Sequence, residues 1–472
     1  KSIIMKIAFH GAARTVTGSK HLITLKNGKK ILLDCGMFQG MGKDTDAMNF
    51  DLGFDASTVT MMVLSHAHID HTGLIPLLVK RGFKGHIFCT PATFDLAQIL
   101  LMDSARIQEE DIKFTNKKRR KVGLPQEEPL YTVDDAKKSI SAFKKVKSYK
   151  EWHRIDDEVE VMFTDAGHII GSAAVTLRIT EGGKPTIITF SGDIGRYNDA
   201  ILKSPDTFPQ ADYILMESTY GSTLHAEAAP ATDVLLRYIH DTCKVKKGKL
   251  IIPAFSVGRT QELLYALNKA QLDGKLPKVD IFVDSPLSTE ATEVVTAHPE
   301  LFNKSVAKLL QIDDDVFDFP GLHFIESVDE SKNLNFRQEP CVIISASGMA
   351  EAGRVKHHIA NNISDTKNTI LMVGYCEPQS LGGRLMRGAK EVSIYGTRYE
   401  VRAEVGSIRS MSAHGDYEDL SQWLSCQNPK EVKKLFLVHG EYEVQQIFRN
   451  WLLKKGFGDI EVPERHSEVG LG

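Results

Sequence analysis

Four side chains that can bind a metal ion lie within the six-residue motif HAHIDH, residues 66–71. Neutral imidazoles and carboxylates are the ligands expected for zinc, and a spacing of two places His66 and His68 on one side of an extended chain. Asp70 and His71 then turn towards a second position. A loop that only satisfies its own hydrogen bonds does not require four such residues, so the motif indicates a metal site.

Other residues of the same types stand alone in the sequence. Asp34 follows the apolar run KKILL, and His439 ends the run KKLFLV. His168 lies in DAGHIIGSA and Asp193 in SGDIG. Taken alone, Asp34 is typical of a turn, and an isolated histidine is more often a hydrogen-bonded core or surface residue. Their order and context decide between these interpretations.

The elements that would position these residues are mostly strands. Two apolar runs joined by the Asn27-Gly28 turn predict a β-hairpin over residues 7–34, and a buried strand over 59–66 leads into the histidine motif. A helix ending near Gly82 follows, and residues 95–150 look mostly helical and contain a basic run. Strands return over 158–168, 173–180, 185–195 and 213–221, and the candidate residues fall repeatedly at strand ends.

After Gly221 the pattern changes to alternating helices and strands. We expect helices over residues 233–243 and 259–271 and from 353, and strands over 249–255, 279–286, 340–349 and 368–375. This alternation predicts a separate domain with a parallel sheet. Beyond residue 393, short β segments, a helix over 418–424, the strand 433–440 and a last helix are expected to rejoin the first domain.

The composition limits the function classes. The 472 residues suffice for two domains, and the net charge of −3 argues against binding a polyanion through an overall positive field. A polyanion would have to be bound by local basic patches or by metal ions. Six cysteines without a CxxC pair suit a reducing compartment, and the N-terminal region shows no signal peptide, so we expect a cytoplasmic protein without a membrane anchor.

The HxHxDH motif resembles the hallmark of the metallo-β-lactamase superfamily, and Asp34, His168 and Asp193 follow in the order of its other signatures. The resemblance implies a centre with two zinc ions. One ion would be held by His66, His68 and His168, the other by Asp70 and His71, with Asp193 bridging both. Asp34 would orient the ligands without touching metal.

Motifs in the second half resemble the β-CASP branch of nucleic-acid-processing enzymes, which contains the cleavage and polyadenylation endonuclease of mRNA 3′-end processing and bacterial β-CASP ribonucleases. These motifs are ESTYG with Glu217, SAHGD with His414, LVHGE with His439, PAFSVGRTQELL, DSPL, HPELF, SASGMAEAGRVKHH and VGY. By resemblance His439 completes the second zinc site, and a histidine there is typical of RNA-cleaving members, whereas Artemis-type DNA nucleases generally have an apolar residue.

The resemblance assigns catalytic roles to Asp70, Asp34, His414 and Glu217. Breaking a phosphodiester leaves an alkoxide that must be protonated, and a histidine such as His414 can do this, with Glu217 orienting it and favouring its protonated form. The structural alternatives are a turn histidine bonded to Asp416 and a simple strand-end salt bridge.

A phosphate or RNA contact is expected in the inserted domain. Ser347 and Gly348 follow an apolar strand and precede a helix, so their amides could hold a phosphate. Arg259 and Arg354 could add charge, although a structural ion pair is an equal alternative for both. The basic run at residues 117–121 either grips RNA or is a solvated helix face.

The predicted fold is α/β: a metallo-β-lactamase αββα sandwich formed by residues 1–209 and 396–472, with an inserted α/β β-CASP domain, residues 210–395, as a lid over a cleft. The predicted function is hydrolysis of single-stranded RNA by a dinuclear metal-activated hydroxide, leaving a 5′-phosphate and a 3′-hydroxyl. Endonuclease and 5′-to-3′ exonuclease action both stay open, and so does self-association of the chain.

Three other functions are weighed against this one. A single-stranded DNA nuclease would share the whole centre. A hydrolase of a small thioester, lactone or β-lactam would not need an inserted α/β domain. A non-catalytic RNA-binding or scaffold protein would be expected to have lost some of the metal-binding positions, all of which are filled here.

Overall fold

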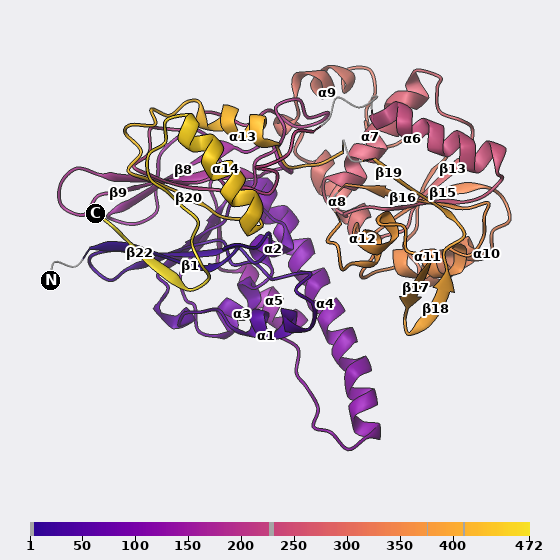
Figure 1. Ribbon diagram of the computed structural model, residues 1–472, viewed down its shortest axis with the longest axis horizontal. Helices are drawn as coiled ribbons and strands as arrows, with labels where there is room; N and C mark the ends of the chain where they lie inside the picture. Colours follow the sequence, from indigo (N-terminus) through magenta and orange to yellow (C-terminus); the bar gives the residue numbers. More distant parts are fainter. Residues whose placement is uncertain (1–3, 226–230, 375, 409–410) are drawn as a thin grey trace. The chain divides into compact units, whose positions relative to one another are not determined.

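The chain divides into two units in the computed structural model, which describes residues 4–225, 231–374, 376–408 and 411–472 (Figure 1). The first unit comprises Lys1–Asp199, Lys203–Leu224 and His414–Gly472, and the second Ala200–Leu202 and His225–Ala413. The domain limits inferred from the sequence, after residues 209 and 395, stay a prediction. Tyr375 of the VGY motif lies outside the described residues.

Two seven-stranded sheets form the centre of the first unit. The strands of one sheet are, in spatial order, β22 (Ser467–Leu471), β1 (Met5–Gly11), β2 (Lys20–Thr24), β3 (Lys30–Leu33), β4 (Met61–Val63), β5 (Ile87–Cys89) and β6 (Phe143–Lys145). The strands of the other are β21 (Ile460–Glu461), β20 (Lys434–Leu437), β11 (Tyr213–Met216), β10 (Thr186–Phe190), β9 (Ala173–Ile179), β8 (Val159–Asp165) and β7 (His153–Arg154).

The alternation of apolar residues along these strands produces a core between the sheets. Ile7, Phe9 and Ile31 from one sheet pack with Val161 and Phe436 from the other in a single buried cluster. The ring centroids of Phe9 and Phe436 lie 5.0 Å apart. Side chains with such alternation cover one face of a sheet, so helices must cover the other.

Helices pack on the outer faces. Ile214 and Leu435 of the second sheet pack with Leu420 and Trp423 of α13 and with Phe448 of α14. The first unit is therefore an αββα sandwich, as predicted. Its helices are α1 (Thr45–Phe50), α2 (Ile69–Thr72), α3 (Ile75–Lys80), α4 (Pro91–Lys121), α5 (Val133–Ile140), α13 (Tyr417–Leu424) and α14 (Tyr442–Lys454), with short 3₁₀ helices η1 (Gly42–Asp44) and η2 (Ala56–Thr58).

The second unit has a six-stranded sheet in which every neighbouring pair is parallel. Its order is β14 (Leu322–Phe324), β13 (Asp280–Val283), β15 (Cys341–Ser345), β12 (Leu250–Pro253), β16 (Thr369–Val373) and β19 (Glu404–Ile408), and a hairpin is added by β17 (Glu391–Ile394) and β18 (Thr397–Glu400). The helices are α6 (Ala231–Ile239), α7 (Arg259–Leu272), α8 (Pro286–Thr296), α9 (Lys304–Leu309), α10 (Val328–Phe336), α11 (Val355–Asn362) and α12 (Leu381–Met386), with a 3₁₀ helix η4 (Pro299–Leu301).

Two elements differ in detail from the sequence pattern. The helix expected over residues 233–243 is α-helical only to Ile239 and continues as the π-helix η3 (His240–Val245), where Thr242 Oγ1 hydrogen bonds to Thr369 Oγ1 at 2.7 Å. Residues 143–145, placed in a helical region, form the edge strand β6, because burial of Phe143 beside Ile87 completes the sheet. Among the described helices, none is long and apolar enough to cross a membrane.

The core between the sheets predicts a large effect for Phe436→Ala. Truncation of this buried ring should lower the free energy of unfolding of the first unit by about 3–5 kcal/mol. All three tryptophans, Trp152, Trp423 and Trp451, lie in this unit, so their fluorescence in a denaturant titration reports on it alone. Phe114→Ala, at a ring 61% exposed, is the control and should change it by less than about 0.5 kcal/mol; equal effects would contradict the described core.

Candidate metal centre

Strand ends bring the candidate residues together. Strands β3 and β4 are parallel neighbours, and so are β10, β11 and β20. The carboxyl ends of parallel strands meet at one edge of a sheet, and there Asp34 follows β3, the motif 66–71 follows β4, Asp193 follows β10, Glu217 follows β11 and His439 follows β20. Segments more than 400 residues apart in sequence thus meet at one place.

A first group of donors consists of His66, His68, His168 and Asp193, whose ligand atoms all lie within 4.8 Å of one another. His68 Nδ1 is 3.2 Å from His66 Nε2 and 3.1 Å from His168 Nε2. Asp193 Oδ2 is 3.4 Å from His66 Nε2 and 3.5 Å from His168 Nε2.

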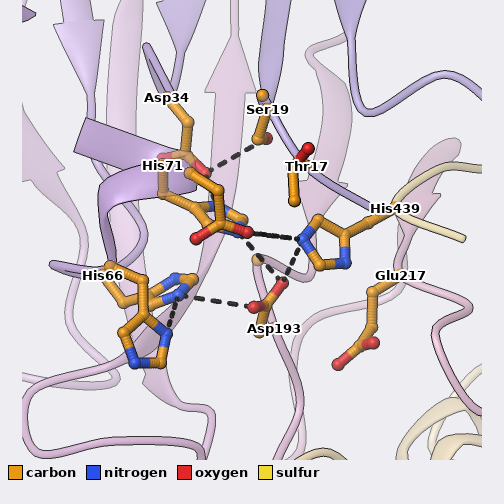
Figure 2. Close-up of polar contacts among 12 residues, drawn as sticks. Thr17, Ser19, Asp34, His66, His71, Asp193, Glu217 and His439 are labelled. Carbon is orange, nitrogen blue, oxygen red and sulfur yellow. Dashed lines mark hydrogen bonds and ion pairs between the residues drawn. The ribbon is translucent and has the colours of Figure 1, made fainter. Parts of the chain in front are cut away.

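A second group lies on the other side of Asp193 (Figure 2). Asp193 Oδ1 is 3.3 Å from His71 Nε2 and 3.6 Å from His439 Nε2. His439 Nε2 lies 3.2 Å from His71 Nε2 and 3.3 Å from Asp70 Oδ2. The two oxygens of one carboxylate therefore face two separate sets of donors.

The spacing of these atoms fits zinc. Four ligands in a tetrahedron at 2.0–2.1 Å from an ion are separated by roughly 3.3–3.4 Å, close to the distances found in both groups. Asp193 is 2% exposed, and within the described part of the chain its Oδ1 accepts no hydrogen bond. A buried carboxylate oxygen that accepts no hydrogen bond is energetically unfavourable unless a cation binds it.

The charges in the centre also call for a cation. Burial lowers the pKa of His71, but Asp193 and Asp70 outweigh it and hold that pKa well above its ordinary value. His66 faces fewer carboxylates, and burial lowers its pKa to about 3, so its ring is neutral and free to bind metal. A dinuclear site would replace the proton that His71 otherwise attracts.

Asp34 sets the tautomers of two of these histidines. The side chain of Asp34 is fully buried, and its backbone adopts a left-handed conformation with φ 58°. Its Oδ2 accepts a hydrogen bond from His71 Nδ1 at 2.6 Å and from Ser65 Oγ at 2.8 Å. Because Ser65 Oγ donates to Asp34, it must accept from His66 Nδ1, 3.0 Å away. In the neutral form of each ring, Nε2 therefore carries the lone pair, and it faces the other metal-binding side chains.

His439 is oriented by residues that the sequence analysis missed. Its Nδ1 donates to Thr219 Oγ1 at 3.0 Å, and its backbone N–H donates to Ala12 O at 2.7 Å. Thr219 follows Glu217 in the ESTYG motif, and Ser65 directly precedes the histidine motif, so proximity to these motifs was the available signal. Hydroxyls are too common for sequence alone to assign such roles.

The loop after Asp34 is locked against the motif 66–71. Cys35 N donates to His71 O and Ser19 N to Asp70 O, both at 2.8 Å. A Cβ atom at Gly36 would lie 1.5 Å from Asp70 O, so only glycine permits this approach.

His414 stands beside the first donor group. Its ring centroid lies 4.5 Å from that of His168, and its Nδ1 is 3.2 Å from Glu217 Oε1. Glu217 is fully buried and also accepts from Ile194 N at 2.6 Å. Burial lowers the pKa of His414, but Glu217, with Asp193 and Asp70, raises it to about 9. The Glu217 carboxylate therefore favours the imidazolium form of His414.

The residues expected to bind phosphate lie in the second unit. Helix α11 begins only at Val355, so Ser347 and Gly348 do not provide its N-terminal amides. Ser347 N instead donates to Ala352 O at 3.1 Å. Arg354 pairs with the buried Asp284 at 2.7 Å and donates to two backbone carbonyls, which is the structural alternative that the sequence left open.

Arg259 has a different environment. It is 6% exposed and pairs with Glu262 one turn along α7. Its Nε has no hydrogen-bond partner among the described residues, and Gly374 approaches the guanidinium closely enough for an added Cβ to lie 3.8 Å from Nε. Arg259 thus keeps a buried donor without a partner among the described residues.

Three family models match the chain. The metallo-β-lactamase superfamily matches residues 19–236, the β-CASP domain 260–385, and a Zn-dependent metallo-hydrolase RNA specificity domain 398–463. A crystal structure of a protein of unknown function from Enterococcus faecalis has a TM-score of 0.52 at 13% identity, covering 99% of this chain and 100% of the other.

Curated relatives are similar over nearly the whole chain. Ribonuclease TTHA0252 of Thermus thermophilus is 33% identical over 442 residues, covering 93% of this chain and 94% of that protein. An RNase J-like protein of Methanocaldococcus jannaschii is 31% identical, covering 92% of each. Transcription termination factor FttA of Methanosarcina mazei is 28% identical over 93% of this chain and 67% of its own length.

The role of Asp34 predicts the outcome of Asp34→Asn. Asp34 Oδ1 accepts from Ser65 N at 2.8 Å while Oδ2 accepts from His71 and Ser65 Oγ, and an amide has an oxygen on only one of these two sides, so zinc affinity should fall about 10- to 100-fold. Competition with a chromogenic chelator measures the affinity. Asp55→Asn, at an exposed aspartate in the same unit, should leave it unchanged. Equal zinc affinity of the Asp34 variant and the wild type would refute the orienting role.

Proposed function

The chain belongs to the β-CASP branch of the metallo-β-lactamase superfamily, and we propose that it is a zinc-dependent ribonuclease that hydrolyses phosphodiester bonds of single-stranded RNA. The single observation that carries this proposal is the pair of donor groups sharing Asp193, with the His414–Glu217 pair beside them. The relatives named as ribonucleases support RNA as the polymer.

Two zinc ions are proposed for each chain. His66, His68 and His168 would hold one, Asp70, His71 and His439 the other, and Asp193 would contribute one oxygen to each. Bound there, zinc lowers the pKa of water and stabilises negative charge on a phosphate. Asp34 would bind the Nδ1 proton of His71 directly and that of His66 through Ser65, so that the Nε2 of each ring is the atom that faces the metal.

His414 is proposed as the general acid. Glu217 holds its Nδ1 in place and raises the pKa of His414 to about 9, which favours the protonated ring that an acid catalyst needs. Protonation of the leaving 3′ oxygen gives the upstream fragment a 3′-hydroxyl, and the phosphate stays on the 5′ end of the downstream fragment. His414, Asp193 and Glu217 also satisfy the distances of a metal-binding group, so zinc content separates the two roles.

Further assignments follow from the same family. We propose Arg259, with Ser347 and Gly348, as contacts to RNA phosphates, and Arg354 as a residue that positions them, because its guanidinium is already paired. We assign residues 1–209 and 396–472 to the metallo-β-lactamase domain and 210–395 to the β-CASP domain. Free cysteines at all six positions support a cytoplasmic location.

RNA cleavage is the direct test. The zinc-loaded chain should cut end-labelled single-stranded RNA in preference to matched DNA, and His439→Ala should abolish cutting. His86→Ala, at an exposed histidine of the same unit, is the matched control and should cut normally. Internal fragments would indicate endonuclease action and mononucleotides exonuclease action. Intact RNA alongside turnover of a thioester or lactone would overturn the proposal.

If His414 is the general acid, its removal should lower activity without lowering zinc content. His414→Ala should lower kcat about 10²- to 10⁴-fold while two zinc ions per chain remain, because its imidazole holds a proton and no metal. Asp193→Ala should lose zinc from both groups. Metal analysis together with single-turnover kinetics measures both quantities. Loss of zinc from the His414 variant would identify this residue as a ligand, and a 2′,3′-cyclic phosphate product would exclude the proposed proton transfer.

A further inference from the structure

A basic arm projects from the first unit. Helix α4 has 31 residues, but beyond Ala105 its only buried residue is Asn116. Residues 106–121 therefore run for roughly 24 Å, at 1.5 Å per residue, without a core to cover. Figure 1 shows this half of α4 extending away from the sheets and the chain returning along it. We define the arm as residues 106–130.

The arm is held firmly although it is exposed. Asn116 Nδ2 donates to Glu127 O at 2.9 Å, and Glu127 N donates to Asn116 Oδ1 at 2.8 Å. Arg119 pairs with the Glu127 carboxylate at 2.6 Å. These contacts fix the returning segment to the helix, so the arm is an ordered projection.

The other end of α4 is fixed to the metal centre. The hydroxyls of Thr90 and Thr93 donate to Gly171 O at 2.7 and 2.8 Å. Gly171 belongs to the loop that carries His168, and a Cβ there would lie 2.6 Å from Thr93 N. The helix therefore places the arm at a set distance and direction from the residues of the first donor group.

The charge of the arm has one sign over a long stretch. Residues 112–126 contain no acidic residue and six basic ones, which are Lys113, Lys117, Lys118, Arg119, Arg120 and Lys121. Among the ion pairs formed within the described residues, only Arg119 of these six takes part. Cations in a last helical turn favour the helix dipole, but this does not account for Lys113 and Lys117, which lie before that turn.

An aromatic ring accompanies the charges. Phe114 is 61% exposed, and Lys118 Nζ lies 4.2 Å from its ring centroid. Positive charges along a backbone track, together with an exposed ring on which a base can stack, are the elements of sequence-independent binding to single strands. An apolar protein partner would not require five unpaired cations.

We propose that the arm binds the phosphate backbone of single-stranded RNA outside the metal centre and so holds long substrates. This inference rests on the proposed function for the identity of the polymer. It makes the arm a determinant of substrate length, since only RNA that extends beyond the centre can reach it.

The test replaces the four unpaired lysines, Lys113, Lys117, Lys118 and Lys121, by glutamine. The matched control replaces Lys84, Lys184, Lys430 and Lys454, four exposed lysines elsewhere in the same unit, and so removes the same charge. A second arm variant with four arginines keeps the charge. Binding to a trinucleotide and to RNA of several tens of nucleotides is measured with the zinc-loaded protein in a His414→Ala background, so that the RNA is not cut during the measurement.

The glutamine variant should bind long RNA about tenfold or more weakly and lose up to about three units of the salt slope, at roughly 0.7 per phosphate contact. Trinucleotide binding and kcat should not change, and the control and arginine variants should bind as the wild type does.

Unchanged affinity and slope for long RNA would overturn the inference while leaving the nuclease intact. Arm-dependent binding without any cleavage would instead overturn the proposed function alone. A change only in self-association, seen by sedimentation, would assign the arm to a second copy of the chain and overturn the inference.

Discussion

The carboxylate of Asp193 is the interaction on which the rest of the structure depends. Its two oxygens face two sets of imidazole nitrogens, and one oxygen is buried without a hydrogen-bond donor among the described residues. The carboxylates of Asp34 and Asp193 are buried and that of Asp70 is partly buried beside them, which is unfavourable unless cations or protons compensate their charge. The fold has to enforce this arrangement, and bound metal would then stabilise the fold in return.

The sandwich enforces it through the direction of its strands. Parallel strands deliver Asp34 and the motif 66–71 from one sheet, and Asp193 and His439 from the other, at strand ends that meet. Buried hydroxyls then choose which nitrogen of each ring carries the proton. Ser65 does this for His66 and Thr219 for His439, so small neutral side chains control the electrostatics of a highly charged site.

Chemistry and recognition are separated in this chain. The net charge of the chain is −3, so an overall positive field does not attract a polyanion, and local positive charge has to do so. The basic residues of the arm lie at the C-terminal end of α4. The N-terminal end of the same helix contacts the loop that carries His168. A rigid helix thus connects a positively charged surface to the reactive centre without placing lysines among the ligands, where they would compete with metal.

Local patterns in the sequence predicted the strands and the metal-binding motif 66–71, and the resemblance to the superfamily supplied the αββα class and the isolated positions His168, Asp193 and His439. Alternation of apolar residues marks strands, and four donors in six residues exceed what packing requires. The sequence did not determine which side chains form ion pairs or hydrogen bonds with one another in the folded chain. Arg354 is paired to Asp284, seventy residues earlier, and His66 and His71 share the carboxylate of Asp34 through different routes.

The sequence also did not predict the edge strand of the first sheet or the part of α4 that projects from its unit. The edge strand β6 exists because Phe143 pairs beside Ile87, a contact between distant segments. The basic run of α4 has the same composition whether its helix is packed or projecting, and only the absence of buried residues after Ala105, apart from Asn116, shows that it projects. Local order follows from neighbouring residues, whereas pairing, burial and projection depend on what the folded chain brings alongside, and tertiary structure alone decides them.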